Sequence, residues 1–346
     1  MAFFSRSKVS KSKLDARLAS VSMQGFDPGL VAKLRTFLLG ASETELSRVD
    51  VVTLADRWEV PRSNVIPLFL HAAKAGVVVM NYVLHCQSCQ STWKKSSMQR
   101  LSHQMACPMC KAGSTPTLDR SVEMAFAIHP EIAGVVPDVS PGKVAFLPAI
   151  EVINTDDFRQ LFEMEKPVPG EYLGVENLTL LFSDLSGSTA VYDRLGDGTA
   201  YGLVREHFLI MFDAIRKHNG SVVKTIGDSV MAAFVSPADA VACALETKNA
   251  FQRFNSRKDI RGQLRLKIGI HAGACLAVTL NQRLDFFGST VNKAARIQDL
   301  ADKDEVCLSE DVARQADGVL LKRKTTRKRV TLRGIKEPVN VLVLRK

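Results

Sequence analysis

Four cysteines in the first half of the sequence form two C-x2-C pairs whose spacing suits a metal ion. The pairs are Cys86 with Cys89 and Cys107 with Cys110, and seventeen residues separate them. Two such pairs are typical of a zinc ribbon, in which four thiolates complete the tetrahedral coordination of Zn²⁺. A redox pair would leave the second C-x2-C unexplained, and disulfides would conflict with a reducing cell interior. The sequence therefore predicts a structural zinc site.

An aspartate between two apolar runs is the second feature that could do chemistry. Residues 222–234 read VVKTIGDSVMAAF, which predicts a β-hairpin that turns at Gly227 and Asp228. A carboxylate held among apolar strands needs a partner, and a metal ion is one that repays its desolvation. The sequence favours this reading of Asp228 if a second ligand lies nearby.

Asp184 is the candidate second ligand because it ends the apolar run LTLLFSDL. The small residues 186–189 follow it, and backbone amides in such a turn can hold phosphate oxygens. If this strand and the hairpin are neighbours in a sheet, Asp184 and Asp228 converge and can bind Mg²⁺ or Mn²⁺. Taken singly, each aspartate is more often a turn or cap residue than a metal ligand.

Bulk properties describe a globular protein with room for two domains. The chain has 346 residues, of which 46% are hydrophobic and 24% charged. No apolar run approaches the roughly 20 residues of a membrane-spanning helix, and the N-terminus lacks the apolar core of a secretory signal. We therefore expect a cytoplasmic protein with no membrane segment.

The net charge of +10 comes mostly from the C-terminal residues 322–346, which hold ten Lys or Arg and one acid. Solvated basic ends explain most of this charge. Nucleic-acid binding is disfavoured because the candidate recognition helix, residues 63–76, offers few polar groups beyond Asn64, His71 and Lys74.

Four segments follow from periodicity and turn signals. We expect a basic flexible tail (1–24), a helix-turn-helix-like or winged-helix domain with a zinc ribbon (25–130), a connector with a short helix (131–172) and a second domain (173–346). Within the accessory domain, residues 121–128 alternate as in a half-buried strand.

The second domain has the element order of a ferredoxin-like α+β fold. Its predicted elements follow the pattern β-α-β-β-α-β. They are a strand at 177–185, a helix at 199–218, the hairpin at 221–234, a helix at 238–254, strands at 264–273 and 274–280, and a helix at 290–301. Cys243, Cys275 and Cys307 are expected to be buried hydrophobes.

Three motifs give this domain a family resemblance. FSDLSGST, VVKTIGDSVMAAF and LDFFGSTVNKAARI, in this order, resemble a class III nucleotidyl cyclase over residues 176–346. The chain has no G-x4-G-K-[ST] loop, so a nucleotide would not be held by a P-loop. The N-terminal half resembles an accessory domain found before bacterial cyclases.

The resemblance implies a two-metal site. Asp184 and Asp228 would bind two Mg²⁺ or Mn²⁺ ions, with the backbone carbonyl of Leu185 as a further ligand. The 3′-hydroxyl of ATP would attack the α-phosphate in line, giving 3′,5′-cyclic AMP and pyrophosphate.

The resemblance also implies the contacts to the nucleotide. Lys224 and Asp285 would read the adenine edge and favour ATP over GTP. Asn292 would position the ribose and Arg296 the α-phosphate. Arg333 stands where the family usually has a lysine that holds the terminal phosphates, and arginine can also grip phosphate.

Spacing agrees with this division of roles. Asn292 and Arg296 are four apart on a predicted helix and share a face. Lys224 and Asp228 are four apart along a strand, about 13 Å, so they can serve different sites.

The family builds each site between two catalytic domains, so a chain with one domain is expected to form a homodimer. The alternatives are a DNA-binding regulator that dimerises through this fold and a catalytically silent scaffold, although no expected site position is missing.

Overall fold

The computed structural model describes residues 9–133, 144–187, 193, 196–257, 265–320, 325–335 and 337–344. The chain divides into two compact units, residues 1–173 and 174–346. The helices in the described part of the chain are all too short or too polar to cross a membrane.

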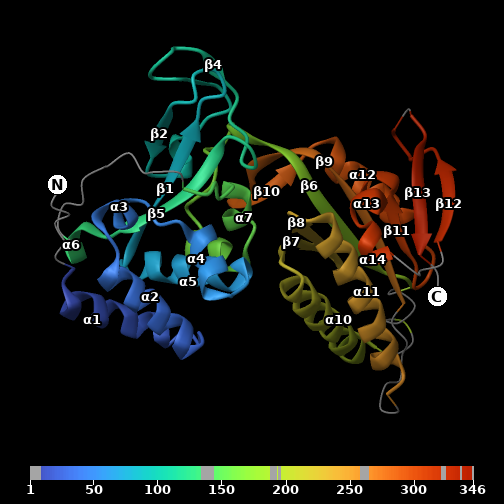
Figure 1. Cartoon of the computed structure of the whole chain (residues 1–346). Coiled ribbons are helices and arrows are strands. Elements are labelled where there is room, and N and C mark those ends of the chain that lie inside the picture. Colours follow the sequence, from blue (N-terminus) through green and yellow to red (C-terminus); the bar gives the residue numbers. More distant parts are fainter. Residues whose placement is uncertain are drawn as a thin grey trace. The chain divides into compact units, whose positions relative to one another are not determined.

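Unit 1, residues 1–173, is a helical bundle followed by a small antiparallel sheet (Figure 1). The sheet has the order β2-β1-β5, and a separate hairpin pairs β3 with β4. The elements are α1 (Lys11–Ser22), α2 (Pro28–Gly40), α3 (Glu43–Ser47), α4 (Val51–Trp58), α5 (Arg62–Lys74), β1 (Val78–His85), β2 (Thr92–Lys95), the 3₁₀ turn η1 (Met98–Arg100), β3 (Met105–Ala106), β4 (Gly113–Ser114), β5 (Val122–Ile128), α6 (Pro130–Ala133), α7 (Ala149–Ile153) and α8 (Asp156–Leu161).

Two expectations for this unit are wrong. The flexible tail predicted over residues 1–24 is wrong for residues 11–22, which form α1 because Leu14, Leu18 and Val21 fall on one face and are buried. Residues 1–8 lie outside the described residues. Strand β5 was expected to be half-buried, but both of its faces are covered. Glu123 on the second face is 2% exposed and contacts Arg48 and His85, so a charge pair satisfies a position that looked solvated.

Helix α5, the candidate recognition helix, belongs mainly to the core of unit 1. It buries Val65, Ile66, Leu68, Phe69, Leu70 and Ala72. Two of its polar side chains bond to α8: His71 Nε2 lies 3.0 Å from Asp157 Oδ1, and Lys74 Nζ donates to the Leu161 carbonyl at 3.0 Å. These contacts occupy two of the few polar side chains with which a recognition helix could contact DNA bases.

Unit 2, residues 174–346, is a sheet with the strand order β12-β13-β11-β9-β6-β8-β7, with β10 paired to β9. Its elements are β6 (Tyr172–Leu185, which begins in unit 1), α10 (Asp197–Lys217), β7 (Gly220–Ile226), β8 (Ser229–Phe234), α11 (Pro237–Asn255), β9 (Leu266–Leu280), β10 (Arg283–Phe287), α12 (Ser289–Asp299), β11 (Val306–Ser309), α13 (Glu310–Gln315), α14 (Asp317–Leu320), β12 (Thr325–Val330) and β13 (Val339–Leu344).

The ferredoxin-like α+β prediction for unit 2 is confirmed. Strands β6, β7, β8 and β9 stand in the order β9-β6-β8-β7, with α10 and α11 as the two crossover helices. These helices lie side by side (Figure 1) and bury Met211, Ile215 and Ala244 in a core shared with the sheet. This core holds in place the sheet whose strands and turns carry the polar residues of the candidate active site.

The two strands predicted at 264–273 and 274–280 are one strand, β9. Gly273, where the first predicted strand was expected to end, serves close packing: a Cβ there would lie 2.9 Å from Thr290 Oγ1 of α12. Gly269 has the same role more strongly, since its Cβ would lie 2.1 Å from the Gln298 amide nitrogen. Both glycines let α12 lie directly on β9.

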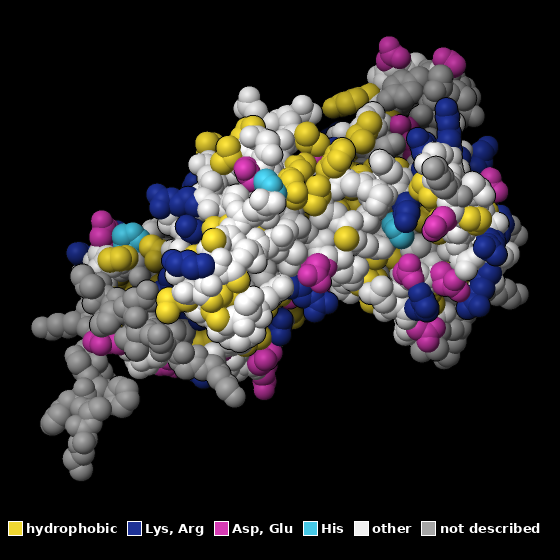
Figure 2. All heavy atoms as spheres, turned by 90° about the horizontal axis from the view of Figure 1, so that it is seen from above, with side chains coloured by type: hydrophobic (Ala, Val, Ile, Leu, Met, Phe, Trp, Pro, Cys, Tyr) yellow, Lys and Arg dark blue, Asp and Glu magenta, His cyan; other side chains and the backbone are white. Residues whose placement is uncertain are grey.

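Basic residues are spread over the surface. On the face in Figure 2, Lys and Arg side chains are interspersed with Asp and Glu side chains. Of the basic C-terminal segment, β12 exposes Arg327, Lys328 and Arg329. Residues 322–324, 336 and 345–346 of that segment lie outside the described residues.

Candidate active site and four-cysteine cluster

The hairpin β7–β8 brings Asp228 beside the end of β6. Strands β6 and β8 are antiparallel neighbours with Ser183 opposite Val230, so Asp184 faces Ser229. The Ser229 hydroxyl donates to Asp184 Oδ1 at 2.7 Å. Gly227 has φ +63°, which lets the turn close tightly next to Asp228. Strand β6 and the hairpin are therefore neighbours in the sheet, which is the arrangement that convergence of Asp184 and Asp228 required.

One oxygen of Asp228 has no partner in the part of the chain that the structure describes. Asp228 Oδ2 is buried and accepts no hydrogen bond from the described residues. A desolvated carboxylate oxygen without a donor is costly, and a hard divalent cation is the ligand that such oxygens prefer. The donor set of Asp184 and Asp228 thus fits Mg²⁺ or Mn²⁺.

Leu185 ends strand β6 beside these carboxylates. Its side chain is 4% exposed and packs in the core, which fixes the backbone at this point. The next amide, that of Ser186, donates to the Arg265 carbonyl at 2.7 Å. Ser188 and Thr189, which the sequence suggested for phosphate contact, lie outside the described residues.

Lys224 and Asp285 meet as an ion pair, which the sequence did not predict. Lys224 Nζ lies 2.6 Å from Asp285 Oδ2, and Asp285 Oδ1 accepts from the Phe286 amide at 2.7 Å. The side chains are 36% and 9% exposed, respectively. A register shift between Val222 and Lys224 marks a β-bulge, which alters how β7 presents its side chains from Lys224 onward.

Helix α12 presents Asn292 and Arg296 away from the sheet. Its buried residues are Thr290, Ala294, Ile297 and Gln298, and Thr290 Oγ1 donates to the Ala274 carbonyl at 2.5 Å. Asn292 is exposed, and Arg296 Nη1 pairs with Asp299 Oδ2 at 2.9 Å. Because that partner is itself 55% exposed, the guanidinium can exchange it for another anion at small cost.

Arg333 is exposed on the connection between β12 and β13. Gly334 follows it with φ +80°, so the backbone turns directly after the side chain. The position can present a cation to solvent.

Sequence reasoning missed His207 on α10. It is fully buried, and neither ring nitrogen has a hydrogen-bond partner among the described residues. Burial lowers the pKa of His207 to about 4, and the charge of Asp228 opposes this only in part. The spacing of His207 from Val204 and Met211 could have placed it on the buried face of the helix.

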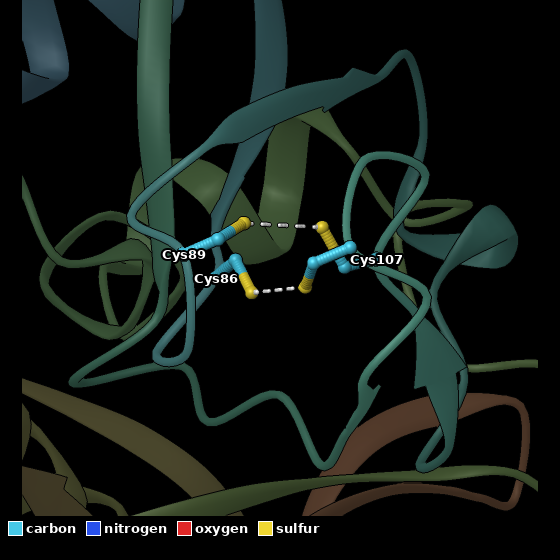
Figure 3. A group of neighbouring side chains, drawn as sticks. Cys86, Cys89 and Cys107 are labelled. Atoms are coloured by element: carbon cyan, nitrogen blue, oxygen red, sulfur yellow. Dashed lines mark hydrogen bonds between the residues drawn. The ribbon is translucent and has the colours of Figure 1, made fainter.

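The four cysteines of unit 1 converge as predicted. Their sulfur atoms lie within 4.8 Å of one another. Cys86 Sγ is 3.7 Å from Cys110 Sγ, and Cys89 Sγ is 3.7 Å from Cys107 Sγ. Figure 3 shows the labelled sulfur atoms pointing toward one another between two loops. All four are free thiols, and the cluster could hold a metal ion.

The two cysteine loops share one backbone pattern. In the first, the Gln90 amide donates to the Cys86 carbonyl at 3.0 Å and Gln90 has φ +61°. In the second, the Lys111 amide donates to the Cys107 carbonyl at 3.0 Å and Lys111 has φ +63°. The Ser91 hydroxyl lies 3.2 Å from Cys107 Sγ, and this contact lowers the pKa of that thiol to about 6.

Two protein families match the chain. The family described as the adenylate and guanylate cyclase catalytic domain matches residues 171–346. A family of unknown function matches residues 12–167. The three cyclase-like motifs all lie within the first match.

Several adenylate cyclases are similar to part of this chain. Adenylate cyclase 2 of Rhizobium meliloti is 27% identical over 179 residues, which is 48% of this chain and 48% of that protein. An adenylate cyclase of Lachancea kluyveri is 28% identical over 154 residues, or 39% of this chain and 8% of that protein. The matches thus span about half or less of these relatives. The adenylyl cyclase CyaB of P. aeruginosa superposes with a TM-score of 0.45 at 22% identity, over 51% of this chain and 96% of that structure.

Proposed function

The chain belongs to the adenylate and guanylate cyclase catalytic-domain family, and from this premise we propose that it is an adenylate cyclase. It would convert ATP to 3′,5′-cyclic AMP and pyrophosphate. The observation that carries the proposal is the meeting of Asp184 and the hairpin of Asp228, where a buried carboxylate oxygen has no partner among the described residues.

In this proposal Asp184, Asp228 and the Leu185 carbonyl hold two Mg²⁺ or Mn²⁺ ions. Bound there, the ions would lower the pKa of the 3′-hydroxyl and offset charge on the phosphates. The bond from Ser229 supports this role, because it fixes the orientation of the Asp184 carboxylate. The buried side chain of Leu185 anchors the third ligand.

Lys224 and Asp285 support adenine as the base. An ammonium group only donates hydrogen bonds, and a carboxylate only accepts them. Adenine offers an acceptor at N1 beside a donor at its 6-amino group, whereas guanine reverses this order. The 2.6 Å contact shows that both side chains reach one place, where they can be separated by a base edge that satisfies each of them.

Asn292, Arg296 and Arg333 complete the proposed site. Asn292 would orient the ribose, Arg296 the α-phosphate and Arg333 the terminal phosphates. All three have a planar donor group, and arginine can contact two phosphate oxygens at once. We propose that a homodimer forms two such sites, with the metal ligands from one subunit and the remaining contacts from its partner.

Product analysis tests the proposal. The purified chain is incubated with ATP or with GTP in the presence of Mn²⁺, and the products are separated by chromatography. We expect cyclic AMP and pyrophosphate in equal amounts from ATP and slower conversion of GTP. Equal or faster conversion of GTP would contradict the roles of Lys224 and Asp285, and no cyclic product from either nucleotide would contradict the proposed activity.

A further inference from the structure

The segment between the two cysteine pairs contacts the stretch of chain that leads into β6. The carboxylate oxygen Oε2 of Glu165 accepts hydrogen bonds from the Met98 amide at 2.7 Å and from the Tyr82 hydroxyl at 3.1 Å. Gln99 Nε2 donates to the Met164 carbonyl at 3.0 Å. Burial and the Glu165 carboxylate raise the pKa of Tyr82 well above its usual value, so this hydroxyl remains a donor.

A second set of contacts lies at the start of β6 itself. Glu171 Oε2 lies 2.8 Å from His103 Nδ1 and accepts from the His103 amide at 3.2 Å. The His103 ring stacks on Tyr172 with 4.6 Å between ring centroids and 20° between planes. Tyr172 is the first residue of β6, and Asp184 lies near the other end of that strand. Residues 98–103 therefore hold the connector at two points.

Strand β2 of this segment pairs with β1, but beyond that strand and the contacts above the segment has little regular structure. Strands β3 and β4 are two residues long and pair only Met105 with Ser114 and Ala106 with Gly113. A hairpin this short is not stable by itself. Between the two cysteine pairs, only Met98 and Leu101 are buried. A metal ion bound by both cysteine loops would add a cross-link at the two ends of this segment.

The sulfur positions match such a cross-link by a metal ion. Tetrahedral Zn²⁺ with Zn–S bonds of about 2.3 Å places its sulfur ligands about 3.8 Å apart. Two of the sulfur pairs are 3.7 Å apart and all four sulfur atoms lie within 4.8 Å of one another, whereas a disulfide would need about 2.05 Å. Four thiolates leave no open coordination position, as in sites that stabilise structure.

We propose that Cys86, Cys89, Cys107 and Cys110 bind one Zn²⁺ and that this ion keeps residues 98–103 in contact with residues 162–172. Zinc occupancy would thereby control how firmly the connector holds the beginning of the strand that carries Asp184. The zinc site and the connector contacts stand independently of the catalytic proposal. Only the effect on turnover rests on the proposed function.

Three variants and two controls separate the parts of this proposal. Cys89→Ser with Cys110→Ser removes the two exposed thiols and leaves the buried pair. Its control is Ser88→Ala, an exposed change in the same loop. Glu165→Ala and Glu171→Ala remove the connector contacts. Glu163→Ala is their control, because Glu163 is an exposed carboxylate of the same connector with no hydrogen bond or ion pair to a described residue.

The first measurements need no enzymatic activity. Elemental analysis should find about one zinc per wild-type or Ser88→Ala chain, and less than about a tenth of that in the cysteine variant. Hydrogen exchange of a peptide covering residues 162–172 should be about tenfold faster in the cysteine and glutamate variants than in wild type. Glu163→Ala should match wild type. No bound zinc, or unchanged exchange after zinc is lost, would overturn the proposal.

Turnover then tests the coupling. A zinc-selective chelator added with excess Mg²⁺ should change the rate of wild-type cyclic AMP formation at least about threefold, and should have no effect on Glu165→Ala with Glu171→Ala. An equal response in both proteins would contradict the connector as the route. If the cysteine variant does not fold, the glutamate variants still decide the matter, since they leave the thiols intact. If no cyclic product forms at all, the proposed function fails while zinc content and exchange still judge the site.

Discussion

The two candidate metal sites differ in how much of the coordination one chain supplies. The cysteine cluster brings four sulfur atoms within 4.8 Å of one another inside unit 1. The hairpin site of unit 2 offers Asp184 and Asp228, and Asp228 Oδ2 is left without a partner among the described residues. A complete ligand set suits a permanent ion, whereas an incomplete one leaves coordination positions for a substrate.

The difference extends to how each site is supported. The two cysteine loops have the same backbone hydrogen bond, and in each the residue after the second cysteine has a left-handed backbone conformation. The hairpin carboxylates rest on strand register and on one hydroxyl, that of Ser229. We infer that the first site was selected for rigidity and the second for access to ligands.

Asp228→Ala breaks the hairpin site with the largest expected effect. Cyclic AMP formation should fall at least about a thousandfold, because half of the carboxylate set is lost. Thermal stability in metal-free buffer should be unchanged or higher, since the substitution removes a buried oxygen without a partner. Asp213→Ala, an exposed change on α10, is the control and should keep full activity. Undiminished turnover in Asp228→Ala would contradict the metal assignment.

Mixing two inactive variants tests whether a second chain completes the site. Asp184→Ala and Asn292→Ala chains, combined in equal amounts, should recover about a quarter of wild-type activity, because half of the dimers are mixed and each has one complete site. Asp184→Ala combined with Asp228→Ala should recover none, since both lesions affect the same half-site. Native mass spectrometry verifies the mixed dimers, and mixed dimers without recovery would rule out a shared site.

The sequence predicted those features in which chemistry follows from local spacing. The C-x2-C pairs, the hairpin turn at Asp228 and the β-α-β-β-α-β order each depend on residues close in the chain, and the structure contains all three. The prediction failed where burial decided the outcome. The second face of β5 looked solvated because the partners of Glu123, Arg48 and His85, lie far away in sequence. Helix α1 looked solvated because three buried residues among many polar ones give a weak signal.

The ion pair of Lys224 and Asp285 shows the same limit within the candidate site. It joins β7 to β10, two strands that are 61 residues apart at these positions and are not paired with each other, so it has no local signal. His207 was missed because a single histidine in an amphipathic helix reveals its burial only through its spacing. Spacing identified which side chains carry chemistry, and tertiary packing determined what each of them contacts.

Selective removal of metal distinguishes the two sites, and its expected effect is intermediate in size. Dialysis against a weak chelator should stop turnover without unfolding either unit, and added Mg²⁺ or Mn²⁺ should restore it, because an incomplete site exchanges its ions readily. A mercurial that binds thiols should release the cysteine-bound ion and lower the stability of unit 1 by several kcal/mol. Circular dichroism measures unfolding, and metal analysis measures release of each ion. Loss of metal from both sites at the same chelator strength would contradict the comparison.

Acid pH gives the smallest expected effect and probes another buried group of unit 2. His271 on β9 is 7% exposed, and its Nδ1 has no partner among the described residues. Burial, and next the charge of Lys293, lower the pKa of His271 from 6.5 to about 4. Below pH 6.5 the unfolded chain therefore binds a proton that the folded chain does not, so stability falls as the pH decreases toward 4.

His271→Leu should remove about 2 kcal/mol of the stability lost between pH 6.5 and pH 5. His207 keeps its own contribution of the same sign, so the variant should still lose some stability in acid. Urea unfolding at pH 7.5, 6.5 and 5 measures the slope. The pH 7.5 value isolates the packing effect of the leucine, because the histidine is neutral in both states there. An identical slope in wild type and variant would show that His271 takes up its proton equally in the folded and unfolded chains, which would contradict the lowering of its pKa by burial.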